Sequence, residues 1–167
     1  MPTILKLKRR REKKTNYRKR LKLLLSGKPR LVIRRSNNYI RLQIVEYDEK
    51  GDKTIIGLLS KNLKKYGWPG SFKNLPACYL SGYLIGKMAL KKNIKEAVAD
   101  TGLHRLTKGC RIFAVIKGAV DAGLNIPHSE SIYPPEDRLL GKHISEELES
   151  LVYRIKESID KEYGEGE

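Results

Sequence analysis

The sequence lacks the features that mark membrane and secreted proteins. No apolar run approaches the ~20 residues that a membrane-spanning helix needs, and the charged N-terminus is not followed by the apolar block of a secretory signal. Cysteine is scarce as well. Cys78 and Cys110 are isolated in the chain, so neither a disulfide framework nor a zinc site is expected. Free thiols of this kind are typical of the reducing cytoplasm.

The sequence also has no compact catalytic motif. It contains neither the glycine fingerprint Gly-x-Gly-x-x-Gly nor a phosphate-binding GxxxxGK[ST] loop. Its three histidines lie on separate segments without the spacing of metal ligands, so each is expected to be a surface or hydrogen-bonding residue. These are His104, His128 and His143.

Four aspartates offer the one catalytic alternative, because carboxylates that converge in space can hold the two metal ions of a nuclease. Two of the four share a predicted turn, where Asp is common for conformational reasons alone. The four are Asp48, Asp52, Asp100 and Asp121. A nuclease is therefore disfavoured, and we expect no enzyme activity, no metal site and no cofactor.

Negative charge is almost absent from one long stretch. Between Lys6 and Arg35 there are fifteen Lys or Arg residues and one acid, Glu12, a net charge of +14 within a chain of formally +16. A concentrated basic segment on a near-neutral body is typical of proteins that bind polyanions. Two alternatives are a solvated tail that only keeps the protein soluble and an arm that binds anionic membranes. The membrane alternative is disfavoured because the arm has leucines but neither Phe nor Trp.

Residues 1–28 are predicted to form a basic arm. Dense like charge without apolar periodicity predicts an extended segment over 1–14 that becomes ordered on a partner. A short helix over 17–26 should follow, capped by Thr15 or Asn16 and ended by Gly27. Its leucines fall on one side, so we expect them to pack on the domain while the cations face outward.

Residues 29–128 are predicted to form an α/β core domain. Three β-prone segments joined by short turns, over 31–35, 39–47 and 54–59, predict a three-stranded antiparallel meander. A helix over 74–92 should cross over to a parallel strand at 96–100, and a buried helix over 110–122 follows. Gly82 and Gly86 imply that the first helix approaches another backbone closely, most simply that of the sheet. The helices are thus expected to pack on the sheet.

The predicted loop over 61–73 contains the single tryptophan, Trp68. Its indole could stack on a nucleotide base, or it could anchor the loop on the core, and we favour the anchor. Tyr39 is a second candidate for base stacking.

Residues 129–167 are predicted to form a C-terminal extension. From Gly141 onward there are eight acids and four bases, and apolar residues recur at helical spacing. They are Leu148, Leu151, Val152, Ile155 and Ile159. This pattern predicts an acidic amphipathic helix, whose apolar stripe must be covered either by the domain or by a neighbouring protein.

An ordered set of segments resembles a known family. In chain order these are RRREKKTNYRKRL, SGKPRLVIRRSN, YGW, NLPACYLSGYLIGKMA, EAVADTGL, KGAVDAGLNIPHSES and GKHI. Together they are similar to archaeal large-subunit ribosomal proteins of the L-eighteen family, whose eukaryotic counterpart is the L-five protein. The similarity is colinear over residues 8–145. The sequence departs from the family at 100–103, where a more aliphatic form is commoner, and in its acidic tail.

The resemblance implies a structural constituent of the large ribosomal subunit in the cytoplasm, and no enzyme. Such proteins bind 5S ribosomal RNA and mediate its attachment to the large-subunit (23S) RNA in the central protuberance, beside neighbouring ribosomal proteins. The family's use of the arm and adjoining strand ends implies a set of RNA-binding residues in this sequence. They are Arg9, Arg10, Arg11, Lys13, Lys14, Tyr17, Arg18, Arg20, Lys28, Arg30, Arg34 and Arg35. The alternative is another RNA- or DNA-binding module, such as a chromatin protein or RNA chaperone, without selectivity for 5S RNA.

Overall fold

A four-stranded sheet lies at the centre of the computed structural model, which describes residues 5–164. The strands are β1 (Arg30–Arg35), β2 (Ile40–Glu46), β3 (Lys53–Leu59) and β4 (Val98–Asp100). Their order is β3-β2-β1-β4. The pairs β1–β2 and β2–β3 are antiparallel, and β4 runs parallel to β1. The predicted meander and the parallel strand after a crossover helix are therefore confirmed.

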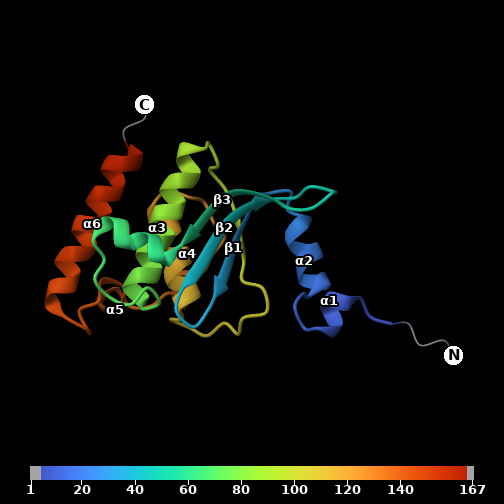
Figure 1. The fold of residues 1–167 in the computed structure, drawn as a ribbon, viewed down its shortest axis with the longest axis horizontal. Helices are drawn as coiled ribbons and strands as arrows, with labels where there is room; N and C mark the ends of the chain where they lie inside the picture. The colour runs from blue at the N-terminus through green and yellow to red at the C-terminus, as the bar shows by residue number, and fades with distance from the viewer. Residues whose placement is uncertain (1–4, 165–167) are drawn as a thin grey trace.

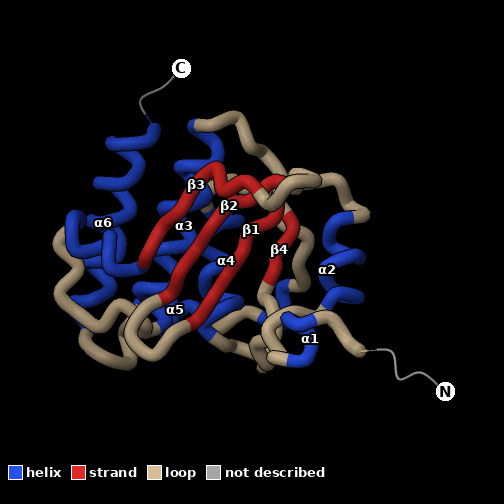
Figure 2. The backbone as a smooth tube through the Cα atoms, turned by 45° about the vertical axis from the view of Figure 1, so that its right-hand side comes forward, coloured by secondary structure: helices blue, strands red, loops and turns tan. Residues whose placement is uncertain are grey.

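Helices lie on both sides of this sheet (Figure 1, Figure 2). On one side are α3 (Leu75–Lys91), α4 (Arg111–Asp121), α5 (Glu136–Leu140) and α6 (Glu146–Gly164). On the other side are α1 (Lys8–Arg11) and α2 (Tyr17–Leu24), which belong to the basic arm. Two short 3-10 helices, η1 (Ser60–Tyr66) and η2 (Glu130–Ile132), complete the fold. Much of the predicted loop over 61–73 is thus helical.

The core lies between the sheet and α3. Alternation along β2 turns Ile40, Leu42 and Ile44 inward, and all three side chains are fully buried. Arg41, between them, is exposed on the opposite face, which carries the contacts to the arm. The sheet therefore separates an apolar interior from a polar open face, and the sequence predicted this division from its period of two.

Glycines bring α3 and α4 into backbone contact. A Cβ atom added at Gly82 would overlap the carbonyl oxygen of Val115, and one added at Gly118 would overlap that of Tyr79. At Gly86 an added Cβ would lie 2.7 Å from the Cβ of Ala122. The predicted close approach is real, but the prediction that the sheet is its partner is wrong. The partner is α4.

We expect Gly82→Ala to lower the free energy of unfolding by about 1–3 kcal/mol, because the new methyl group forces two packed helices apart. Urea denaturation followed by circular dichroism measures this change. Gly57→Ala on β3 is the matched control, since a Cβ there meets no atom within 4 Å. Equal losses in the two variants would contradict the packing argument.

The acidic helix α6 packs on α3. Val152, Ile155 and Ile159 are at most 1% exposed, so the domain itself covers the apolar stripe. Charged contacts accompany this packing, because Asp160 accepts hydrogen bonds from the hydroxyl group of Tyr83 and the ammonium group of Lys87, each at 2.8 Å. Burial favours a raised pKa at Asp160, but the hydrogen bonds from Lys87 and Tyr83 outweigh it and hold the pKa below its usual value. Leu148 and Leu151, nearer the start of the stripe, are only half-buried.

Candidate nucleic-acid interface

The arm has more local structure than its sequence predicts. The segment Lys8–Arg11 forms one turn of helix. The sequence predicted an extended chain over residues 1–14, and residues 1–4 of that range lie outside the described residues. The backbone then folds back, and the guanidinium Nε of Arg9 donates to the hydroxyl of Thr15 at 2.9 Å. This bend leads directly into α2.

The limits of α2 follow from its end residues, as predicted. Asn16 is the cap, because its side-chain oxygen accepts from the backbone N–H of Lys19 at 3.2 Å. Beyond the last turn, Gly27 adopts a φ of 63°, in the left-handed region where glycine is favoured. The helix is therefore fixed in direction at both ends.

The prediction that α2 packs on the domain through its leucines is only partly correct, because Leu24 is half-buried and the other leucines of the predicted apolar side are more exposed. The helix has no buried residue, and Leu21 and Leu25 are 60% and 77% exposed. Polar contacts connect it to the domain instead. The ammonium group of Lys19 donates to the hydroxyl of Thr101 at 2.9 Å and to the carbonyl of Gly102 at 3.1 Å.

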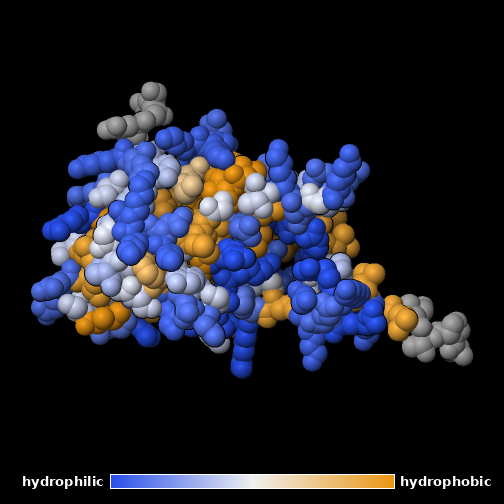
Figure 3. All heavy atoms as spheres, viewed as in Figure 1, coloured by the Kyte–Doolittle hydropathy of each residue, from blue (hydrophilic) through white to orange (hydrophobic). Residues whose placement is uncertain are grey.

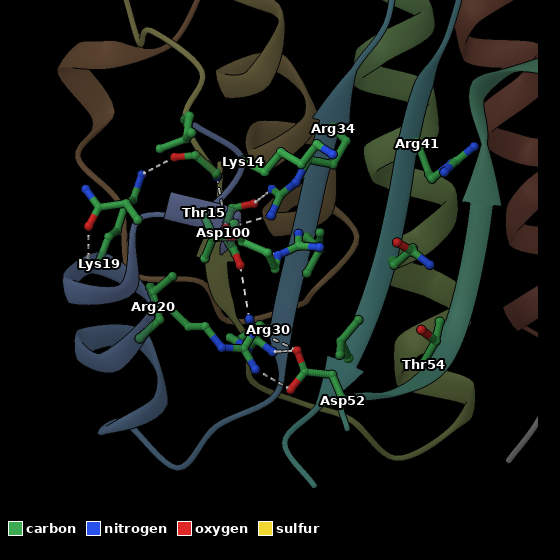
Figure 4. A pocket seen from close by; sticks show the side chains of 18 residues that line it. Lys14, Thr15, Lys19, Arg20, Arg30, Arg34, Arg41, Asp52, Thr54 and Asp100 are labelled. Carbon is green, nitrogen blue, oxygen red and sulfur yellow. Dashed lines mark hydrogen bonds and ion pairs between the residues drawn. The ribbon is translucent and has the colours of Figure 1, made fainter. Parts of the chain in front are cut away.

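A chain of ion pairs continues this connection into the sheet (Figure 4). Arg20 on α2 donates two hydrogen bonds of 2.8 Å to the carboxylate of Asp52, in the turn between β2 and β3. Asp52 also pairs with Arg30 on β1, which reaches Asp100 on β4 at 3.1 Å. Asp100 in turn pairs with Arg34 at 3.1 Å. A continuous chain of three arginines and two aspartates thus joins α2 to the turn before β3 and to β4, the two edge strands of the sheet.

Burial changes the role expected of Arg30. Its side chain is 3% exposed and has two carboxylate partners, so the prediction that it contacts RNA is corrected: it is a positioning residue. Arg20 and Arg34 keep 34% and 41% of their side chains exposed. Both can still donate to a further acceptor, because guanidinium groups have five N–H donors.

A hollow of about 360 Å³ lies between the arm and the open face of the sheet. We call it the arm hollow. Seven cationic and two acidic side chains line it, so it attracts anions and its concave shape concentrates that field. The cations are Arg9, Lys14, Lys19, Arg20, Arg30, Arg34 and Arg41, and the acids are Asp52 and Asp100.

Most of the cations predicted to bind RNA are exposed. Hydrophilic side chains predominate over the part of the molecule formed by α1 and α2, with hydrophobic residues exposed among them (Figure 3). Lys14 pairs with its neighbour Glu12, and Lys28 pairs with Glu96 in the segment before β4. Tyr17 is half-buried. The exposed cations are Arg9, Arg10, Arg11, Lys13, Lys14, Arg18, Lys28 and Arg35. The structure therefore brings Arg9, Lys14, Arg20, Arg30 and Arg34 together around the arm hollow and leaves the other predicted cations on the outer surface of the arm or at a strand end.

The two aromatic candidates differ in position. Trp68 is 3% exposed, and its indole N–H donates to the carbonyl of Ser71 at 3.2 Å. The anchoring role holds, and stacking on a base is excluded by this burial. Tyr39 is half-buried, with its ring centroid 6.3 Å from that of Phe72. Stacking of Tyr39 on a nucleotide base stays a prediction.

The aspartates considered as nuclease ligands do not gather. Among residues 5–164 no group of three or more His, Cys, Asp or Glu side chains could hold a metal ion. Asp52 and Asp100 serve as partners of arginines, whereas Asp121 accepts from Tyr79 at 2.8 Å and pairs with Lys117 at 2.9 Å. None of the helices within that range is long and apolar enough to cross a membrane.

Acidification should release α2 from the domain. The hydrogen bond from Arg20 holds the pKa of Asp52 below its ordinary 3.8, against the opposing effect of burial and with help from Arg30. A lowered folded-state pKa means that Asp52 stabilises the docked arm above about pH 4 and loses this effect as the pH falls through the lower value. The NMR signal of the Arg20 Nε–H group, followed between about pH 6 and pH 2, measures docking.

Asp52→Asn serves as the control for this titration, because its amide does not ionise. We expect a weakly docked arm in that variant at every pH. Release of the wild-type arm well above pH 5, or docking that persists after Asp52 has been protonated, would contradict the assignment.

The fold and the site define a class: an α/β domain whose sheet carries a cationic arm suited to a polyanion. Comparison with known proteins identifies the class more closely. A family model described as ribosomal large subunit proteins 60S L5 and 50S L18 matches residues 4–98 and 91–129. The large ribosomal subunit protein uL18 of Methanococcus maripaludis is 56% identical over 144 residues, which cover 86% of this chain and 75% of that protein. The chain belongs to this family of large-subunit ribosomal proteins, which are structural proteins and not enzymes.

Proposed function

We propose that the chain binds 5S ribosomal RNA and attaches it to 23S RNA in the central protuberance of the large subunit, in the cytoplasmic ribosome. The observation that carries this proposal is the arm. Residues 5–28 hold twelve Lys or Arg residues and one acid, a net charge of +11. This arm lies against the open face of the sheet and keeps most of its cations exposed. Membership of the family supports RNA as the polyanion.

The form of an RNA helix explains why a cationic arm suits it. The major groove of an A-form helix is deep and narrow, so proteins bind its phosphates and 2′-hydroxyl groups and recognise unpaired bases in loops. Arginine fits this task because its planar guanidinium group holds a phosphate through two hydrogen bonds and can also stack on a base. We therefore assign phosphate contacts to the exposed arginines Arg9, Arg10, Arg11 and Arg18.

The docked helix gives the arm a defined direction. Arg20 fixes α2 to Asp52, and Lys19 fixes it to the loop after β4. A preorganised arm loses less conformational entropy on binding than a free one. Arg20, Arg30 and Arg34 thus contribute by positioning the arm, and the exposed cations contribute the charge that holds RNA.

A salt titration of binding to 5S RNA, beside a duplex RNA of equal length, tests the proposal. If about eight cations neutralise phosphates, log K should fall against log salt with a slope of roughly −6 to −7. A preference for 5S RNA that survives physiological salt supports the proposal. Equal affinity for both RNAs, lost together as salt rises, would make the arm a general polyanion-binding segment and would overturn the 5S assignment.

A further inference from the structure

A second group of cations lies apart from the arm. Arg35 at the end of β1, Lys73 before α3 and Arg111 at the start of α4 line a hollow of about 450 Å³. We call these three residues the second cation cluster. Ser36, Asn37 and His104 complete the lining. Three segments that are distant in the sequence therefore bring three positive charges to one place.

No carboxylate compensates this charge. The lining of the hollow contains no acid, and within residues 5–164 none of its three cations takes part in an ion pair. The arm hollow differs, because Asp52 and Asp100 occupy part of the hydrogen-bonding capacity of its arginines. The second cation cluster thus keeps its donors free for an external anion.

The strand geometry of β1 separates the two sites. Arg34 lies on the open face and pairs with Asp100. Arg35 is the next residue, and because successive side chains of a strand point to opposite faces, it lines the other hollow. The two hollows share no lining residue among those described. The two groups of cations therefore consist of different residues and can be altered independently.

Local hydrogen bonds hold the second cluster in place. The backbone N–H of Arg35 donates to the imidazole of His104 at 3.1 Å, which ties the end of β1 to the loop after β4. The guanidinium group of Arg111 donates to the carbonyl of Lys73 at 3.4 Å, which joins the starts of α4 and α3. The cluster thus rests on backbone positions that are fixed by the core.

The chemistry of the lining favours nucleic acid over protein. All six lining side chains are polar or charged, whereas the centre of a protein–protein interface is depleted of charge and enriched in apolar and aromatic residues. Contacts to an RNA backbone, by contrast, come mainly from Arg, Lys, Ser and Asn side chains that reach phosphate and sugar.

We propose that the second cation cluster binds the phosphate backbone of a second RNA segment, separate from the RNA held by the arm, so that one chain connects two RNAs. This inference rests on the proposed function, because it supplies the second contact that attachment of one RNA to another requires. Neutralising the cluster should break the connection and leave binding by the arm intact.

The test uses the full chain, 5S RNA and a fluorescent 20-base-pair RNA duplex of unrelated sequence as the second probe. The chain is first saturated with 5S RNA, and the duplex is then titrated into the complex at low salt. We expect the wild type to capture the duplex. Combined replacement of Lys73 and Arg111 by Gln should weaken capture about fivefold or more and leave the affinity for 5S RNA within about twofold, because up to two phosphate contacts are lost at one site only. Arg35 is kept in this variant because the family resemblance also assigns it to 5S RNA.

Two further variants make the result specific. A control with Lys64 and Lys161 replaced by Gln removes the same charge from exposed positions outside both hollows, and it should capture the duplex like the wild type. Lys73→Gln alone alters an exposed side chain whose ammonium group has no hydrogen-bond partner among residues 5–164, so it preserves the fold, and it should weaken capture partially.

The outcomes separate this inference from the proposed function. Failure of the wild type to prefer 5S RNA overturns the proposed function. Preference for 5S RNA without capture of the duplex overturns the inference alone. Equal loss of both RNAs in the Lys73 and Arg111 double variant, or equal loss of capture in the charge control, would also overturn it, because either result removes the independence of the second cation cluster.

Discussion

Deletion of residues 1–15 is expected to remove most of the affinity for 5S RNA and to leave a folded domain. The deletion takes away seven of the fifteen cations between Lys6 and Arg35, and roughly four phosphate contacts with them. At about 0.7 kcal/mol for each contact, within the range of exposed ion pairs, the loss is about 100-fold in affinity. The salt slope should become shallower by about 3, because each lost contact removes about 0.7–0.9.

The domain should remain folded because the deletion ends before the cap of α2. Asn16, Lys19 and Arg20 are retained, so the contacts that dock the helix persist. The described residues of the deleted segment contribute no buried side chain to the core. Circular dichroism and thermal unfolding measure the fold of the shortened chain. Loss of the fold on deletion would show that the arm is an integral part of the domain.

A charge-preserving variant separates the two properties of arginine in the arm. Replacement of Arg9, Arg10 and Arg11 by Lys keeps the net charge but removes the guanidinium fork. If charge alone mattered, the affinity would stay unchanged. We expect an affinity for 5S RNA between that of the wild type and that of the chain without residues 1–15. The salt slope should stay unchanged, because the charge is kept while bidentate geometry and stacking are lost.

The fold was predictable where the sequence repeats at short range. Alternation along 39–47 placed Ile40, Leu42 and Ile44 in the core, and helical spacing in the tail placed Val152 and Ile155 against α3. Both patterns express a local period, which one sequence is enough to reveal. The partner of Gly82 was not predictable in this way. A glycine in a helix indicates that another backbone lies close, but it does not indicate which one, and here that backbone belongs to α4.

The site shows the same limit. The charge of the arm and the cap at Asn16 are local features, and both were found. The docking of α2 depends on Arg20 and Asp52, which are 32 residues apart, and on Arg30 and Asp100, which are 70 apart. Such pairs leave no local pattern. The register of the parallel strands carries a usable signal. Asp100 pairs with Val32, so it lies on the same face of the sheet as Arg30 and Arg34, which are two residues before and two after Val32.

Replacement of Asp100 by Ala should have the largest effect on stability among single changes at this site. The carboxylate accepts hydrogen bonds from Arg30 and Arg34 at 3.1 Å each and from the backbone N–H of Gly102 at 2.9 Å. Its removal leaves the buried guanidinium group of Arg30 with Asp52 alone, and that carboxylate is shared with Arg20. Breaking a buried ion pair on one side costs about 3–5 kcal/mol, and the remaining partner places this case near the lower value.

Urea denaturation measures the change, and two comparisons identify its cause. Asp137→Ala removes a carboxylate that is 77% exposed and 3.8 Å from Lys142, so its loss should stay within about 0.5 kcal/mol. In an Arg30→Met background the Asp100→Ala change should cost much less, since no buried cation is left unpaired. An equal cost in both backgrounds would show that Arg30 is not the cause.

The effect of Asp100→Ala on RNA binding has a sign that distinguishes positioning from charge. Removal of a carboxylate makes the arm hollow more positive, so charge alone predicts tighter binding to 5S RNA. Positioning predicts the opposite, because loss of Asp100 releases Arg30 and Arg34 and weakens the docking of α2 through Asp52. We expect weaker binding at a temperature where the variant is folded. Since electrostatic attraction can only strengthen in this variant, a fall in affinity can come only from loss of the geometry that the ion-pair chain imposes on the arm.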